Sequence, residues 1–242
     1  MKTLVVLQPG YLPWLGYFDL LSKADVFVHY DDVQFDKHGW RNRNRVKGPK
    51  GAIWLTVPVL HHGRGGQSIL EVEIDDRRDW RRKHLSTIGQ LYAHAPFVQT
   101  ILPRLREIIE RPWPRLVDLD LALIGWLAAE IGISTPCYRA SELDIGGNRI
   151  ERLVNLCKHF GAGRYVSGNA ARDYLDVTRF AAAGIEVVWH DYAHPTYAQQ
   201  HGDFVPYLSV LDLVLNAGAR SLSILSQPAV SSDADAERAE LR

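Results

Sequence analysis

The alternation of apolar runs and polar breaks at the start of the chain predicts a βαβ unit. An apolar run at residues 4–7 ends in a segment rich in proline and glycine, and a helical pattern leads to a second apolar run at 26–30. Two strands joined by a crossover helix lie parallel. Because ligands bind outside the carboxyl ends of parallel strands, we expect a site where these two runs end.

The rest of the pattern predicts an α/β fold with a helical insert. Residues 53–59 read as a buried strand, 69–74 alternate as a half-exposed strand, and helical periodicity then holds from 79 to 131 in three helices. Further strands are expected at 135–139, 164–166 and 185–190, with helices at 148–160, 177–183 and 205–216. This order predicts an open, mostly parallel, Rossmann-like sheet with helices on both faces.

The same pattern suggests how the chain is divided. We expect a first βαβ half with a basic loop at 1–78, a helical subdomain closing over the sheet at 79–132, and a second α/β half at 133–220. Residues 221–242 lack aromatic side chains and end in a polar run, so we expect a disordered tail. A chain of 242 residues is long enough for one elaborated domain.

Charge and composition limit the classes of partner and the cellular location that we expect. Lys and Arg number 28, as do Asp and Glu, so no net charge favours nucleic acid or a membrane surface. No apolar run is long enough to span a membrane or to act as a signal peptide, so we expect a cytoplasmic protein without membrane insertion. Cys137 and Cys157 stand in apolar surroundings, which predicts two buried, reduced thiols. No metal-ligand spacing occurs among the histidines, and the sequence identifies neither a cofactor nor an oligomeric state.

The opening loop, QPGYLPWLGY at 8–17, carries the first candidate chemistry. Its two prolines stiffen the backbone, and its two glycines permit close approach. A rigid loop that enters a helix N-terminus suits a phosphate or a carboxylate. The alternative is a tight connection packed by Trp14 and Tyr17. We take Gln8, Tyr11 and Trp14 as candidate site residues.

The second apolar run also ends in polar side chains. Asp31, Asp32 and Gln34 follow it directly. If the strand continues, the two adjacent carboxylates point to opposite sides, so only one of them faces the site. That carboxylate could hold an amine or hydroxyl, accept a proton or share a metal ion. The alternative is a solvated turn, or ion pairs with the basic loop that follows.

The basic loop at 37–50 contains six Lys or Arg residues and no acid. In an extended chain its alternating arginines would line one face and its asparagines the other. Guanidinium groups grip phosphate and carboxylate with two hydrogen bonds, so the segment resembles a clamp for an anion. A solvated surface is the alternative. The candidate binding residues here are Trp40, Asn42, Arg43 and Arg45.

Two further groups complete the candidates. His84 stands one helical turn from Trp80 and could act as a general acid or base, or serve as a hydrogen-bonded structural residue. Ser167 and Gly168 end a buried strand in the second half. This corner lacks the Gly-x-Ser-x-Gly pattern of a nucleophile elbow, so a serine hydrolase is not favoured. We expect Tyr174, Tyr197 and Gln199 to line the same cleft.

Together these segments resemble the WbqC-like protein family over residues 3–218. The likeness is carried by QPGYLPWLGYF at 8–18, ADV at 24–26, DDVQF at 31–35, RNR at 41–43, YVSG at 165–168 and PTYAQ at 195–199. The family is associated with gene clusters for bacterial surface polysaccharide (O-antigen) and natural products. The resemblance therefore implies a biosynthetic role and leaves the reaction open.

A more distant likeness concerns the nucleotidyltransferase-like α/β fold, as in pantothenate synthetase. Those enzymes place ATP phosphates at a histidine-containing loop before the first helix. Here Tyr17 stands where the second histidine of that motif would fall, and residues 1–28 contain no histidine. The resemblance therefore implies a loop that can cradle phosphate, without the usual histidines for ATP activation.

We therefore expect an enzyme, a transferase or ligase, that acts on an anionic small molecule. The substrate would be a nucleotide-linked amino sugar or an activated acyl or aminoacyl donor, and the reaction group transfer or amide formation. Arg43 and Arg45 would hold the anion, and Gln8, Asp32 and His84 would carry the chemistry.

Two alternatives remain open at this point. The protein could be a non-catalytic binding or carrier protein of a biosynthetic cluster. It could also be a hydrolase that uses Ser167 or Cys157 as its nucleophile. The favoured hypothesis requires the opening loop, the arginine segment and the Ser167–Gly168 corner to meet at a common hollow.

Overall fold

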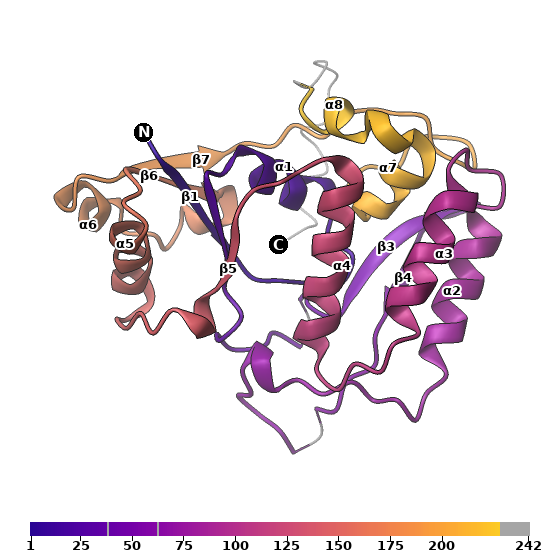
Figure 1. Cartoon of the computed structure of the whole chain (residues 1–242), viewed down its shortest axis with the longest axis horizontal. Helices are drawn as coiled ribbons and strands as arrows, with labels where there is room; N and C mark the ends of the chain where they lie inside the picture. Colours follow the sequence, from indigo (N-terminus) through magenta and orange to yellow (C-terminus); the bar gives the residue numbers. More distant parts are fainter. Residues whose placement is uncertain (38, 62, 228–242) are drawn as a thin grey trace.

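The computed structural model describes residues 1–37, 39–61 and 63–227, and its centre is a five-stranded parallel sheet (Figure 1). The strand order is β5-β2-β1-β6-β7, and every neighbouring pair is parallel. The strands are β1 (Thr3–Leu7), β2 (Val26–His29), β5 (Cys137–Arg139), β6 (Arg164–Gly168) and β7 (Glu186–His190). This confirms the predicted Rossmann-like α/β fold and the parallel pairing of the first two strands.

Helices cover both faces of this sheet, as the sequence pattern predicted. Figure 1 shows α5 (Arg149–His159) and α6 (Val177–Ala182) on one side, and α1 (Leu15–Lys23) on the other. Alternate residues of β1 point to opposite faces: Leu4 and Val6 pack in the core of α5 and α6, while Val5 packs in the core of α1. Two cores, back to back, therefore hold the sheet.

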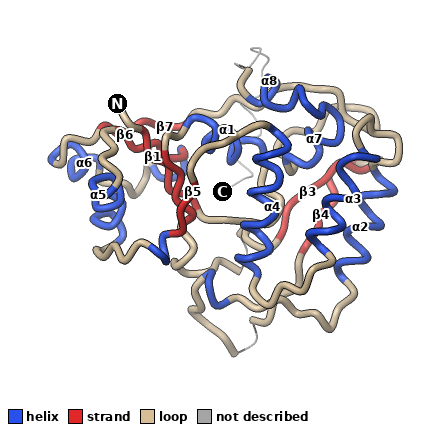
Figure 2. Tube along the Cα trace, viewed as in Figure 1, coloured by secondary structure: helices blue, strands red, loops and turns tan. Residues whose placement is uncertain are grey.

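A second layer packs beyond α1 and contains an antiparallel hairpin (Figure 2). The hairpin pairs β3 (Arg43–Gly48) with β4 (Gly51–Thr56). The predicted helices of the insert are present as α2 (Trp80–Leu91), α3 (Val98–Ile109) and α4 (Leu116–Ile131), and α7 (Val210–Ala217) and α8 (Ser221–Leu225) lie beside them. Their apolar faces share one core with Val5 and α1. The insert thus extends the core on one side of the sheet.

Four short 3₁₀ helices connect these elements within the described residues. They are η1 (Ile69–Glu71), η2 (Ala140–Glu142), η3 (Asn169–Ala171) and η4 (Gly218–Arg220). The first occupies the place of the strand predicted at 69–74, which is therefore wrong. Its cause is local: the Glu71 carboxylate accepts hydrogen bonds from the backbone N and hydroxyl of Ser68, and this reciprocal cap starts a helical turn.

Three other expectations are also corrected. The run at 53–59 is not buried throughout, because the outer face of the hairpin is open and Trp54 is 45% exposed. Cys137 is exposed because β5 is an edge strand, whereas Cys157 is buried as expected. The helix predicted at 205–216 begins only at Val210.

The predicted tail begins later than expected. Residues 221–225 form α8, because the apolar side chains there meet the core and Leu225 is fully buried. The remainder of the predicted tail, from 228 to 242, lies outside the described residues. No helix within the described part of the chain is long and apolar enough to cross a membrane.

The two glycines of the opening loop are explained by close packing. A Cβ on Gly10 would lie 2.7 Å from the carbonyl oxygen of Trp40, and a Cβ on Gly16 would lie 2.3 Å from the indole of Trp14. The first lets the segment at 40–41 approach the end of β1. The second lets the Trp14 ring lie against the first turn of α1. Both glycines therefore position tryptophans.

We predict that Gly16→Ala lowers the free energy of unfolding by about 1–3 kcal/mol, because the new methyl group collides with a packed indole. The matched control is Gly125→Ala, in the middle of α4, where a Cβ meets no atom within 4 Å. That control should be neutral or stabilising by up to about 1 kcal/mol, since alanine favours a helix. Urea unfolding followed by circular dichroism measures both. Equal effects at the two positions would contradict the packing role of Gly16.

Candidate functional site

A cavity of about 1680 Å³ opens where β1 and β6 end. Leu7 and Gln8 reach it from β1, and Ser167 and Gly168 reach it from β6. The chain crosses from β1 to β2 on one side and from β6 to β7 on the other, so the strand order reverses between β1 and β6. A crevice forms at such a switch point because the two crossover helices cover opposite faces of the sheet.

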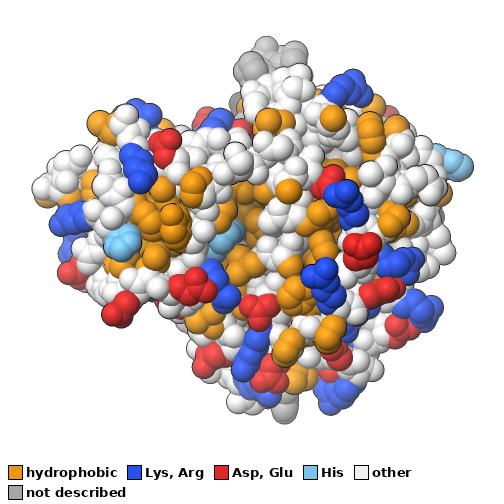
Figure 3. Space-filling model, in the orientation of Figure 1, with side chains coloured by type: hydrophobic (Ala, Val, Ile, Leu, Met, Phe, Trp, Pro, Cys, Tyr) orange, Lys and Arg blue, Asp and Glu red, His pale blue; other side chains and the backbone are white. Residues whose placement is uncertain are grey.

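The described lining of this cavity is strongly cationic. One acidic side chain, Asp36, belongs to it, against five basic side chains: Lys37, Arg41, Arg64, Arg149 and Arg152. The chain as a whole is neutral, and Figure 3 shows basic and acidic side chains interspersed over the face drawn there, so this excess is local. A concave site with such a charge balance attracts an anion.

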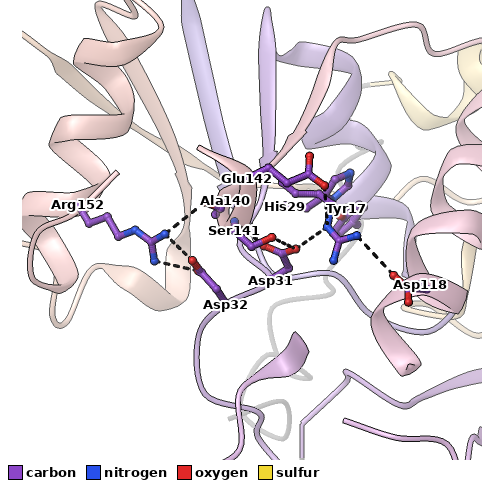
Figure 4. A network of polar contacts seen from close by, with 10 residues as sticks. Tyr17, His29, Asp31, Asp32, Asp118, Ala140, Ser141, Glu142 and Arg152 are labelled. Atoms are coloured by element: carbon purple, nitrogen blue, oxygen red, sulfur yellow. Dashed lines mark hydrogen bonds and ion pairs between the residues drawn. The ribbon is translucent and has the colours of Figure 1, made fainter. Parts of the chain in front are cut away.

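Two of these arginines lie in the first turn of α5. Cations at a helix N-terminus oppose the helix dipole, so their position there needs compensation. For Arg152 it is an ion pair with Asp32, whose carboxylate accepts hydrogen bonds from the guanidinium at 2.9 and 2.5 Å (Figure 4). The Arg149 guanidinium lies 5.9 Å from the ring centre of Tyr174, which is 58% exposed.

The neighbouring Asp31 has a different environment. Its side chain is fully buried and accepts hydrogen bonds from the backbone N of Ser141 at 3.0 Å, the Ser141 hydroxyl at 2.8 Å and Arg139 Nε at 2.7 Å. Figure 4 shows Asp31 and Asp32 directed toward different partners, as adjacent residues in an extended segment should be. Both form ion pairs, and the partner arginines belong to the second half of the sheet instead of the basic loop. Neither aspartate lines the cavity.

Aromatic rings form another part of the cavity lining. Trp14, Trp40 and Tyr207 all belong to it. The Trp14 ring packs against Tyr192, with ring centres 5.4 Å apart, and against Tyr207, at 5.8 Å. Trp40 packs on Trp54 with ring centres 5.0 Å apart. These contacts hold the tryptophan faces in fixed positions.

Arg41 connects this wall to the end of β1. Its guanidinium donates hydrogen bonds to the carbonyl oxygens of Gln8 at 3.0 Å and Pro9 at 3.2 Å. Its own carbonyl accepts from the backbone N of Tyr11 at 2.9 Å. Burial lowers the pKa of Arg41, and the buried Asp120 opposes that shift. Arg41 thus places a partly desolvated positive charge beside Gln8.

Tyr11 and His84 lie away from the cavity, in an enclosed cluster. The Tyr11 hydroxyl and His84 Nδ1 are hydrogen-bonded at 2.9 Å, and the ring of Trp80 packs on both. Tyr11 is fully buried, and burial lowers the pKa of His84 to about 4. His84 therefore has the enclosed, hydrogen-bonded environment that is expected of a structural histidine.

The arginines of β3 point out of the cavity because the strand pleat turns their neighbours inward. Asn42 is buried and donates to the carbonyl oxygen of Val57 at 2.8 Å. The guanidinium of Arg43 lies 4.7 Å from the ring centre of Trp54, and that of Arg45 lies 5.4 Å from the ring centre of Trp40. The predicted separation of arginines and asparagines is present, and the arginines stack on tryptophans beside the cavity.

The side chains of Tyr197 and Gln199 also form hydrogen bonds inside the protein. The Tyr197 hydroxyl donates to the Asp212 carboxylate at 2.8 Å, and Tyr92 donates to the same carboxylate at 2.7 Å. The Gln199 side chain donates to the carbonyl oxygen of Val205 at 2.9 Å and accepts from its backbone N at 2.8 Å. These bonds shape the loop before α7 and do not face the cavity.

The structure thus divides the sequence candidates into two sets. The set that lines the cavity is Gln8, Trp14, Gln34, Trp40, Ser167, Gly168 and Tyr174. The set outside its lining is Tyr11, Asp31, Asp32, Asn42, Arg43, Arg45, His84, Tyr197 and Gln199. The opening loop, the segment at 40–44 and the Ser167–Gly168 corner do meet at one hollow, as the favoured hypothesis requires.

Sequence reasoning grouped Arg41 with Arg43 and Arg45 in the predicted anion clamp, and of these three Arg41 lines the hollow. It missed three cationic residues there: Arg64, Arg149 and Arg152. A signal for Arg149 and Arg152 exists in the sequence, since two arginines three residues apart begin a helix just after Gly146, Gly147 and Asn148. Cations are disfavoured at that end of a helix, so their presence indicates a specific partner.

Comparison with known proteins places this geometry in a family. The model of the WbqC-like protein family matches residues 8–224. The chain belongs to the WbqC-like protein family. The uncharacterized protein Rv1507c of Mycobacterium tuberculosis (strain ATCC 25618 / H37Rv) is 39% identical to it over 223 residues, which cover 91% of this chain and 96% of the relative. No solved structure matches the chain.

The match to the WbqC-like family begins directly after β1 and covers β2, β5, β6 and β7 of the sheet and the helical insert. It therefore includes every candidate residue of the cavity. Among the described residues, no group of three or more His, Cys, Asp or Glu side chains is arranged to hold a metal ion.

We predict that His84 makes stability depend on pH. Burial lowers its pKa from 6.5 to about 4, so between these values the unfolded chain binds a proton that the folded chain does not. Its contribution is complete above about pH 6.5 and is lost as the pH falls toward 4. Urea unfolding from pH 4 to 7 should therefore show a steeper rise in stability for the native chain than for His84→Gln.

The comparison between the two proteins is necessary because other groups titrate in the same range. Burial raises the pKa of Asp120 and Asp212, and these carboxyls act with the opposite sign. Subtracting the His84→Gln curve removes their contribution. Parallel curves for the two proteins would show that His84 is protonated equally in the folded and unfolded chains.

Proposed function

We propose that this WbqC-like protein is a biosynthetic enzyme that binds a small molecule carrying phosphate or carboxylate and transfers a group from it. The observation that carries the proposal is the cluster of five basic side chains, against one acidic one among the described residues of the lining, at the switch point of a parallel sheet. The substrate class is a nucleotide-linked amino sugar or an activated acyl or aminoacyl donor. The reaction is group transfer or amide formation.

The anionic part of the substrate would lie against α5. Arg149 and Arg152 stand three residues apart in its first turn, on the same side of the helix, and both line the cavity. Ser167 and Gly168 lie at the adjoining strand end, and a Cβ on Gly168 would meet no atom within 4 Å. A phosphate there would find guanidinium donors, a hydroxyl and unobstructed backbone.

Proton transfer would fall to Asp32, with Gln8 orienting the reacting group. Asp32 does not line the cavity. Arg152 does line it, and its guanidinium forms an ion pair with the Asp32 carboxylate. An anion bound to Arg152 would compete for the guanidinium and free the carboxylate to accept a proton. The family resemblance suggests that the product belongs to a bacterial surface polysaccharide or a natural product.

A non-catalytic carrier is the second candidate. It is favoured by one observation: Asp32 and His84, the two side chains expected to move protons, both have partners in the folded chain. A carrier needs the same cationic cavity but no available acid or base. The two candidates therefore predict the same binding and different turnover.

We predict that inorganic pyrophosphate binds the native protein and that Arg149→Gln weakens binding by about 10- to 100-fold. This is the range expected for one hydrogen-bonded charge pair. The matched control is Arg179→Gln, which removes an arginine that is ion-paired with Asp176 on the outer helix α6. Isothermal titration calorimetry at low salt measures all three proteins. No binding to the native protein, or equal losses in both variants, would contradict the assigned anion site.

We further predict turnover of an activated donor. Nucleotide sugars, ATP and acyl-coenzyme A, each mixed with a panel of amines and sugars, should include a donor whose consumption is detected by mass spectrometry. Asp32→Asn should slow that consumption by about 10²- to 10⁴-fold, the usual contribution of a general base. Its pyrophosphate affinity shows whether Arg152 is still in place. A ligand that binds tightly and is recovered unchanged would instead identify a carrier.

A further inference from the structure

The two walls of the cavity differ in origin and in chemistry. Two of the five basic side chains in the described lining, Arg149 and Arg152, come from the second half of the chain together with Tyr174 and the Ser167–Gly168 corner, and this part is the cationic wall. Another part, the tryptophan wall, presents aromatic rings from the opening loop, the segment before β3 and the loop before α7. Its rings are Trp14, Trp40 and Tyr207. A single uniform ligand would not need two such different walls.

The size of the cavity also indicates that a single small ligand would not fill it. Its volume of about 1680 Å³ exceeds the roughly 300–1,000 Å³ of sites that enclose one drug-sized molecule. A molecule that filled only the cationic wall would leave the tryptophan faces in contact with water. Exposed indole faces are costly unless a ligand covers them.

The tryptophan wall is held in place before any ligand arrives. Trp40 is packed against Trp54 and lies under the guanidinium of Arg45. Tyr207 has a backbone φ of +57°, an uncommon value for a residue with a side chain. Its carbonyl oxygen accepts a hydrogen bond from Arg45 at 3.2 Å, which ties it to the hairpin. A rigid aromatic wall spends little conformational entropy when a ring stacks on it.

The polar groups beside these rings are largely committed to the backbone. The Arg41 guanidinium donates to the carbonyl oxygens of Gln8 and Pro9, and the side chain of Asn44 donates to the carbonyl oxygen of Leu12 at 2.8 Å. The Gln8 side chain also lines the cavity. One amide beside packed rings suits a molecule with a flat or ring-shaped apolar face and a few hydrogen-bonding groups.

We infer that the cavity is a two-ligand site. The cationic wall binds the anionic molecule of the proposed function, and the tryptophan wall binds a second, uncharged, ring-bearing molecule at the same time. This inference rests on the proposed anion site and deepens it, since a transfer reaction needs a donor and an acceptor side by side. The acceptor class is thus a neutral ring compound, stacked on Trp14 or Trp40.

The test uses inorganic pyrophosphate for the cationic wall, and methyl β-glucopyranoside and nicotinamide as neutral ring probes. Saturation-transfer NMR should detect at least one ring probe on the native protein, and saturating pyrophosphate should not displace it. Trp40→Ala should weaken ring-probe binding by about 3- to 10-fold, the measured range for an aromatic pair. Trp126→Ala, on α4 outside the cavity lining, is the matched control.

A second variant keeps the test decisive if Trp40→Ala fails to fold. Trp40→Phe retains a smaller ring and should give an intermediate loss. Displacement of the ring probe by pyrophosphate would overturn the two-ligand inference alone, since both would then share one site. Absence of binding by either ring probe would also overturn it. Failure of pyrophosphate itself to bind would overturn the proposed function as well.

Discussion

The reversal of strand order between β1 and β6 is the constraint on which the rest of this structure depends. Because α1 covers one face of the sheet and α5 the other, no crossover helix closes the gap at the carboxyl ends of these two strands. Gln8 and Ser167, 159 positions apart in the chain, thereby line the same cavity. Every functional proposal for this WbqC-like protein starts from that opening.

Two sets of charged side chains lie around the opening. Arg149 and Arg152 stand at the dipole-opposed end of α5, and Asp32 behind Arg152 offsets part of that repulsion. Asp31 forms the second set of contacts, because its carboxylate accepts hydrogen bonds from Arg139 and Ser141 near the start of η2. The adjacent aspartates thus fasten the first half of the sheet to the second and leave a net positive surface toward the cavity.

The main role of the opening motif is to position the segments and rings that pack against it. Gly10 admits the Trp40 segment, Gly16 admits the Trp14 ring, and the Tyr11 hydroxyl closes on His84 in the core. Of the motif at 8–17, Gln8, Pro13, Trp14 and Tyr17 contribute side chains to the cavity lining. The motif therefore defines the shape of the aromatic wall more than the chemistry of the site, and both Tyr11 and His84 lie outside the cavity lining.

The amino-acid pattern by itself determined the parallel sheet, the helical insert and the strand ends at which the cavity opens, because period and strand polarity are local properties. It also separated the arginines of β3 from the asparagines, since the pleat alternates. Only the tertiary structure decided which polar side chains remain at the cavity. Arg43 and Arg45 are stacked on tryptophans of the hairpin and His84 is enclosed by Trp80, while Arg41 and Arg149 line the cavity. Contacts of this kind join residues distant in the chain, so the alternation at 41–45 could not show which arginines line the cavity, although the two arginines at the start of α5 do carry a local signal.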